Sequence, residues 1–145
     1  MPNLQKHKTI AIAESCTGGL LGHLITQTPG CSDYFLGGVI SYDNRIKRSL
    51  LGVSQSTLKR FGAVSPQAAR EMAQGVCKRF RADIGIGITG IAGPDGGSQE
   101  KPIGLVYIAL ASGKKTTVKK FRFRGGRSRV KQQAAEKALR FLGFA

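Results

Sequence analysis

The segment Ile84-Gly85-Ile86-Gly87-Ile88 alternates isoleucine with glycine, and this alternation limits the possible folds of the chain more than any other feature. Successive residues of a β-strand face opposite sides of a sheet, so a strand here places isoleucine on one face and glycine on the other. Glycine inside a strand indicates that another stretch of backbone approaches closely, because a side chain would fill that space. We therefore expect a strand that is crowded on its glycine face.

The spacing of apolar residues predicts further strands and helices on both sides of this segment. Short apolar runs predict strands over residues 9–13, 34–42, 104–110 and 116–123, the last two forming a hairpin. Helical spacing predicts helices from residue 20 to about 27 and over residues 43–51, 66–80 and 127–142. This order favours a single α/β domain over residues 1–145, a three-layer α/β/α sandwich with a mixed, mostly parallel sheet of about five strands.

The charge of the chain is strongly positive and unevenly distributed. The 145 residues include 23 Lys and Arg against 8 Asp and Glu, a formal net charge of +15. Residues 1–100 carry 11 basic and 7 acidic side chains, whereas residues 101–145 carry 12 basic and 1 acidic. Such a segment is compatible with weak, salt-sensitive binding to nucleic acid and equally with a solvated face, and both interpretations stay open.

Several classes of protein are disfavoured by the sequence. No apolar run approaches the roughly 20 residues that span a bilayer, and no signal peptide follows the first residues, so we expect a cytoplasmic protein without membrane contact. The three cysteines, Cys16, Cys31 and Cys77, are far apart, and His7 and His23 are the only histidines. We therefore expect neither a disulfide framework nor a metal site, and no cofactor.

The first candidate for chemistry is the turn that joins the strand over residues 9–13 to the following helix. Ser15 lies in this turn, followed by Thr17, Gly18 and Gly19. A hydroxyl beside the unpaired N–H groups of a helix start suits an acyl-transfer nucleophile or a phosphate site, and the glycines let a substrate approach the backbone. The alternative is structural, because serine and threonine are also common helix N-caps.

The second candidate is the end of the strand over residues 34–42. Neither histidine is placed to activate Ser15, so a lysine of lowered pKa is the more plausible base, and Lys47 follows Tyr42 by five residues. Cys16 is an alternative nucleophile, although it is expected to pack inward if Ser15 faces a ligand. Lys47 also fits a surface position on a helix beside Arg45.

The third candidate is the glycine-rich segment Thr89-Gly90-Ile91-Ala92-Gly93-Pro94-Asp95-Gly96-Gly97-Ser98. It contains too much glycine for a regular element and is expected to form a loop. Its N–H groups can line an anion-binding concavity, and the alternative is a plain surface connection. The carboxyl ends of the strands in an open α/β sheet are where ligands bind, so the three candidates are expected to lie together.

These segments together resemble the CinA C-terminal domain family, in the same order and over nearly the whole chain. The motifs that carry the resemblance are Ala13-Glu14-Ser15-Cys16-Thr17-Gly18-Gly19, Ser41-Tyr42-Asp43-Asn44-Arg45-Ile46-Lys47, Leu50-Leu51-Gly52-Val53, Gly62-Ala63-Val64-Ser65, and Thr89 to Ser98 with Glu100-Lys101-Pro102-Ile103-Gly104. The resemblance implies an α/β/α sandwich and a nicotinamide-nucleotide amidohydrolase. Such an enzyme converts nicotinamide mononucleotide and water to nicotinate mononucleotide and ammonia in pyridine-nucleotide salvage.

The resemblance also implies a serine nucleophile with a lysine and a tyrosine, and no metal. Carried onto the matching motifs, these are Ser15, Lys47 and Tyr42, with either of the last two as the base. The oxyanion is then held by N–H groups of Thr17-Gly18-Gly19 or of Thr89-Gly90-Ile91. For the phosphate, the candidates are the loop through Gly93, Gly96 and Gly97, or an arginine.

One departure from the family pattern lies near the C-terminus. The family often has Gly-Asp-Arg with an arginine four residues later, whereas this chain has Gly125-Gly126-Arg127 with Lys131. Any contact made by that aspartate is therefore missing. The resemblance implies a homo-oligomer, and the alternative function is a basic nucleic-acid-binding or regulatory module without catalysis.

Overall fold

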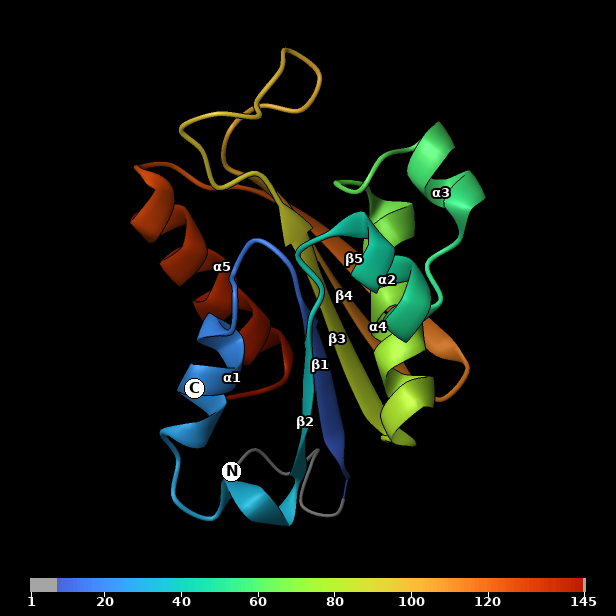
Figure 1. The fold of residues 1–145 in the computed structure, drawn as a ribbon. Helices are drawn as coiled ribbons and strands as arrows, with labels where there is room; N and C mark the ends of the chain where they lie inside the picture. Colours follow the sequence, from blue (N-terminus) through green and yellow to red (C-terminus); the bar gives the residue numbers. More distant parts are fainter. Residues whose placement is uncertain (1–7, 145) are drawn as a thin grey trace.

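A computed structural model describes residues 8–144 and shows an open sheet with helices on both faces (Figure 1). The elements in chain order are β1 (Ile10–Glu14), α1 (Leu20–Thr26), the short 3₁₀ helix η1 (Cys31–Asp33), β2 (Phe35–Ile40), α2 (Asn44–Leu51), α3 (Gln55–Arg60), α4 (Pro66–Phe80), β3 (Ile84–Gly90), β4 (Leu105–Ser112), β5 (Lys115–Arg122) and α5 (Arg127–Phe141). None of the described helices is long and apolar enough to cross a bilayer.

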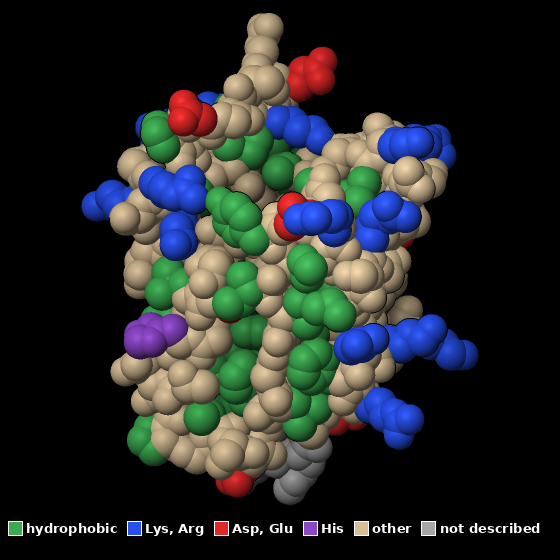
Figure 2. Space-filling view, viewed as in Figure 1, with side chains coloured by type: hydrophobic (Ala, Val, Ile, Leu, Met, Phe, Trp, Pro, Cys, Tyr) green, Lys and Arg blue, Asp and Glu red, His purple; other side chains and the backbone are tan. Residues whose placement is uncertain are grey.

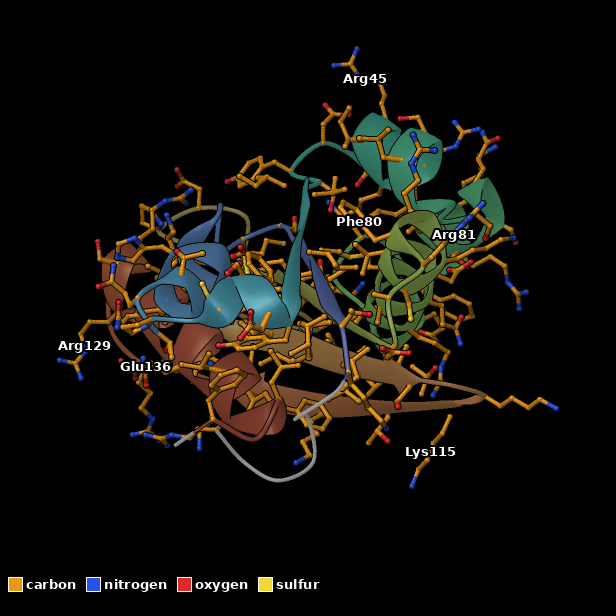
Figure 3. All side chains as sticks on the ribbon, turned by 90° about the horizontal axis from the view of Figure 1, so that it is seen from below. Arg45, Phe80, Arg81, Lys115, Arg129 and Glu136 are labelled. Carbon is orange, nitrogen blue, oxygen red and sulfur yellow. The ribbon has the colours of Figure 1, made fainter. Side chains whose placement is uncertain are left out.

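The five strands form one mixed sheet in the order β2-β1-β3-β4-β5. The pairs β1–β2 and β1–β3 are parallel, whereas β3–β4 and β4–β5 are antiparallel. Helices α1 and α5 pack together on one face, and α2 and α4 cover the other (Figures 1 and 3). The prediction of a three-layer α/β/α sandwich with a five-stranded mixed sheet is confirmed.

The isoleucine and glycine faces of β3 take different partners, as the alternation predicts. Ile84, Ile86 and Ile88 are buried in the core formed with α1 and α5. On the opposite face, a Cβ atom on Gly87 would lie 2.6 Å from the carbonyl oxygen of Ala69 in α4. Real Cβ atoms do not approach backbone so closely, so glycine is what lets α4 lie directly on the sheet. The expected crowding of this strand is confirmed.

The observed elements differ from the expected ones in several places: η1 and α3 were not predicted, and β2 ends at Ile40 rather than at residue 42. Helix α3 was not predicted, because Leu58 is the only apolar residue of this six-residue helix and no hydrophobic period results. Its start is fixed locally, since the Ser54 hydroxyl accepts a hydrogen bond from the N–H of Thr57 at 3.0 Å. The expectation of a loop from Thr89 is wrong by two residues, because Thr89 and Gly90 continue β3 and pair with β4.

Replacement of Gly87 by alanine is expected to lower the free energy of unfolding by about 1–3 kcal/mol, since the methyl group must push α4 from the sheet. Gly126→Ala is the matched control, because no atom lies within 4 Å of the added methyl group and the φ angle of −72° suits alanine. Urea unfolding followed by circular dichroism measures both. Equal stability of the two variants would contradict the close approach of α4.

Candidate active site

A cavity of about 270 Å³ opens at the carboxyl end of the three parallel strands. Ser15 follows β1, Tyr42 follows β2, and Thr89 and Gly90 end β3, so the three candidate segments meet at this end of the sheet, as expected. The cavity is lined by Ser15, Cys16, Tyr42, Asn44, Lys47, Ala63, Val64, Thr89, Gly90, Ile91, Ala92, Gly93, Asp95, Gly96 and Arg127.

The Ser15 side chain is held at the wall of this cavity by its backbone. Its N–H donates to the carbonyl of Ile88 at 3.1 Å, which extends the pairing of β1 with β3 by one residue. The chain then turns into α1 through Gly18 and Gly19, whose φ angles of 60° and 105° are in the left-handed region. Glycine enters this region without the steric cost that other residues meet. The glycine pair therefore permits the sharp turn after Ser15.

The amine of Lys47 lies directly beside the Ser15 hydroxyl. Asp43 caps α2, so Lys47 lies in the first turns of this helix, with a side chain that is 1% exposed. Its Nζ is 3.1 Å from the Ser15 Oγ, 2.8 Å from the Ser41 carbonyl oxygen and 3.2 Å from that of Tyr42. The alternative of a solvated surface position does not hold for Lys47, whereas it does hold for Arg45, which extends into solvent (Figure 3).

Burial shifts the Lys47 amine toward its neutral form. Loss of water around the ammonium form lowers the pKa of Lys47 from its usual value, against a smaller raising effect of Cys16 and Asp43. A neutral amine has two N–H donors and one lone pair. As an ammonium, Lys47 donates to the Ser15 hydroxyl and to both carbonyl oxygens; once it loses one proton, the carbonyl oxygens keep its two N–H groups and its lone pair faces the Ser15 hydroxyl.

Tyr42 occupies a different place from Lys47. Its side chain is 59% exposed at the mouth of the cavity, and its hydroxyl accepts a hydrogen bond from Arg127 Nη2 at 3.0 Å. Arg127 also donates through Nη1 to the carbonyl of Gly93 at 2.6 Å. Arg127 thus joins the end of β2 to the glycine-rich loop. Sequence reasoning noted this arginine without placing it in the site, because α5 lies 85 residues after Tyr42.

Neither Cys16 nor His23 offers a competing centre. Cys16 lines the cavity but is buried, and burial raises the pKa of its thiol to about 12. A thiol of such high pKa stays protonated and is a poor nucleophile. His23 is exposed on α1, and His7 lies outside the described residues. Over residues 8–144, no group of three His, Cys, Asp or Glu side chains is placed to hold a metal ion.

The hydrogen bonds of the backbone separate the two candidate sets of oxyanion donors. The N–H of Ile91 donates to the Leu105 carbonyl, and that of Gly18 donates to the Ser15 carbonyl. Between residues 8 and 144, the backbone offers no acceptor to the N–H groups of Cys16 and Thr17. Of the two, Cys16 lines the cavity and Thr17 does not, so the Cys16 N–H is the donor placed for a negative charge that develops beside Ser15.

Of the predicted binding residues, five line the cavity and four do not. Thr89, Gly90, Ile91, Gly93 and Gly96 form its wall, whereas Thr17, Gly18, Gly19 and Gly97 are absent from it. Thr17 and the two glycines instead shape the turn, and Gly97 is exposed farther along the loop. The wall also includes Asn44 and the pair Ala63 and Val64, which sequence reasoning left without a role. The Thr89 hydroxyl donates to the Ala63 carbonyl at 2.7 Å and fixes that pair.

Comparison with known proteins supports one family throughout. The sequence profile of the CinA C-terminal domain matches residues 3–144. A CinA-like protein of Microcystis aeruginosa is 57% identical over 135 residues, and one of Syntrophomonas wolfei is 53% identical over 135 residues. These matches cover 91% and 93% of this chain but only 32% of each relative, so the chain spans about a third of their length.

Solved structures agree with this assignment. The crystal structure of the competence/damage inducible protein CihA from Agrobacterium tumefaciens superposes with a TM-score of 0.91 at 40% identity, covering 94% of this chain and 84% of that one. A CinA superfamily protein from Enterobacter cloacae gives a TM-score of 0.90 at 35% identity, covering 94% and 80%. With a family profile that spans nearly its whole length, this chain belongs to the CinA C-terminal domain family.

Proposed function

We propose that the protein is an amidohydrolase that converts nicotinamide mononucleotide and water to nicotinate mononucleotide and ammonia. The observation that carries this proposal is the 3.1 Å contact between the Ser15 hydroxyl and the buried amine of Lys47. A hydroxyl beside a lysine of lowered pKa is an activated nucleophile, and amide hydrolysis by acyl transfer is the reaction that such a pair performs. The family membership is consistent with this substrate.

In the proposed reaction, Lys47 is the base, because Tyr42 bonds to Arg127 rather than to Ser15. Neutral Lys47 takes the Ser15 proton while Oγ attacks the carboxamide carbon, and the N–H group of Cys16 stabilises the oxyanion. Collapse of this intermediate breaks the C–N bond, and the Lys47 ammonium gives its proton to the leaving NH₂ group, which departs as ammonia. Water, deprotonated by Lys47, then attacks the ester; the bond to Ser15 Oγ breaks, Oγ takes the proton back from Lys47, and the carboxylate product is released.

The anionic mononucleotide also needs a positively charged partner, and Arg127 is the lining residue that supplies it. Its guanidinium has five N–H donors, of which two are used by Gly93 and Tyr42. The remaining donors leave Arg127 free to bind a phosphate in addition. Figure 2 shows other Lys and Arg side chains around this end of the molecule, which would raise the local concentration of an anion.

The Ser15→Ala variant is expected to lose nearly all deamidation of nicotinamide mononucleotide, because it has no nucleophile to form the acyl-enzyme. Ammonia release is measured with purified protein in the presence of EDTA, and nicotinate mononucleotide is identified by chromatography. Ser49→Ala, an exposed position on α2, is the matched control. Undiminished turnover by Ser15→Ala, or none by the unchanged protein, would refute the proposal.

The pH dependence of kcat/KM is expected to report the titration of Lys47. Below its lowered pKa the amine is protonated and cannot accept the Ser15 proton, so the rate falls as the solution becomes more acidic. The rate should level off at higher pH, below the usual range of lysine. Lys47→Met should abolish this limb together with activity, while Lys78→Met on the exposed side of α4 retains both. If the residual activity of Lys47→Met still falls in acid with the same midpoint, the base is another residue.

Replacement of Arg127 by alanine is expected to raise KM for nicotinamide mononucleotide by about tenfold or more, through loss of a charge-assisted bond to the phosphate. Nicotinamide riboside has the same amide without the phosphate, so its kcat/KM should change much less. Comparing the two substrates with both proteins separates phosphate binding from a general disturbance of the site. An equal loss for both substrates would contradict a phosphate contact.

A further inference from the structure

Glu14 is the last residue of β1, directly before Ser15, and its carboxylate is buried with an exposed fraction of 1%. Oε1 accepts a hydrogen bond from the N–H of Leu21 at 2.9 Å, and Oε2 accepts one from the N–H of Gly22 at 3.0 Å. Both donors belong to the first turn of α1. The side chain therefore reaches across the Ser15 turn to the start of the following helix.

This contact replaces a helix cap that the turn itself does not provide. The N-cap position of α1 is Gly19, which makes no side-chain hydrogen bond to the helix. The N–H groups of the second and third helical residues are those that an N-cap side chain normally satisfies. A carboxylate is favoured there, because the helix N-terminus carries partial positive charge. Glu14 thus holds residues 15–20 at both ends, since its backbone directly precedes Ser15 and its side chain accepts hydrogen bonds from the start of α1.

The backbone of Glu14 holds the other half of the reacting pair. Its carbonyl oxygen accepts hydrogen bonds from Ser41, from the N–H at 2.7 Å and from the Oγ at 3.2 Å. The Ser41 carbonyl oxygen is in turn the nearest acceptor of the Lys47 amine. One residue therefore fixes both the loop that carries Ser15 and the strand end against which Lys47 is held.

We propose that Glu14 is a positioning residue of the Ser15–Lys47 pair, a role that rests on the proposed function. Its side chain does not line the cavity and so does not act on the substrate. It acts by fixing the direction of the Ser15 hydroxyl and of the Cys16 N–H group. Displacement of reacting groups by about 1 Å costs up to a hundredfold in rate, so loss of this fixation lowers kcat rather than substrate binding.

Glu14→Gln tests this role with almost no change of volume. The amide keeps one oxygen acceptor, but its NH₂ group faces an N–H donor of α1 and loses that bond. Glu14→Asp keeps the charge on a side chain one methylene shorter. Glu136→Gln is the control for the same chemical change, since Glu136 lies on α5 (Figure 3) and accepts a hydrogen bond from Gln132 of the same helix.

The first measurement is the rate at which an aryl sulfonyl fluoride labels Ser15, followed by intact mass and peptide mapping. An activated hydroxyl forms the O–S bond, fluoride leaves, and the proton passes to the base. We expect labelling of Glu14→Gln to be slower by about tenfold to a hundredfold, that of Glu14→Asp to be slowed as well, and that of Glu136→Gln to be unchanged. Rates are expressed per folded molecule, with the folded fraction from circular dichroism.

The second measurement is the kinetics of nicotinamide mononucleotide deamidation as a function of pH. We expect kcat of Glu14→Gln to fall by a similar factor, while KM and the midpoint of the pH profile stay unchanged. The midpoint should not move because the Lys47 amine contacts Ser15, Ser41 and Tyr42 and not the Glu14 carboxylate. If Glu14→Asp is faster than Glu14→Gln, the role of Glu14 depends on its hydrogen bonds to the N–H groups of α1.

Four outcomes overturn the proposal. Labelling that falls only in proportion to the folded fraction assigns Glu14 a purely structural role, and wild-type rates in Glu14→Gln assign it none. A shifted pH midpoint assigns it to the proton transfer itself. If the unchanged protein is labelled at Ser15 but does not deamidate the nucleotide, the substrate proposal fails while labelling still decides the role of Glu14. If neither occurs, Ser15 is no nucleophile and both proposals fail.

Discussion

Burial of one charged side chain against a hydroxyl is the constraint on which the candidate site depends. Removing an ammonium group from water costs several kcal/mol unless close acceptors replace the water, and Lys47 meets this cost with two carbonyl oxygens and the Ser15 hydroxyl. The acceptors come from the ends of β1 and β2, and the amine comes from α2. The pair exists only while β1, β2 and α2 keep their relative positions.

The glycine face of β3 helps to determine where α2, and with it Lys47, lies. Because Gly85 and Gly87 carry no side chains, α4 lies directly on the sheet, and α2 packs against α4. The position of α2 relative to the sheet therefore depends on how closely α4 approaches the sheet. On the opposite face, the isoleucines of β3 form the larger apolar core with α1 and α5. The alternation of isoleucine and glycine in β3 thus supplies side chains to one core and determines the position of α2, the helix that carries Lys47.

The sequence predicted much of this structure because the relevant signals are local. Ser65 before Pro66 and the apolar spacing after it define α4, and the predicted helix over residues 66–80 has the observed bounds. Helix α3 escaped prediction because a short polar helix at the surface has no hydrophobic period. The glycine content around Thr89 and Gly90 predicts a loop, whereas both residues pair with β4. That contact forms only in the assembled sheet and has no local signal in the sequence.

The sequence by itself determined where the strands and helices lie and which residue types are available at the carboxyl end of the sheet. Tertiary structure alone decided how those residues are used. The Ser15–Lys47 contact joins residues 32 apart, and the Tyr42–Arg127 contact joins residues 85 apart. Local spacing carries no information on such contacts, and the lowered pKa of Lys47 arises from burial beneath segments that are distant in sequence. Periodicity placed most of the elements, whereas packing brought Lys47 to Ser15.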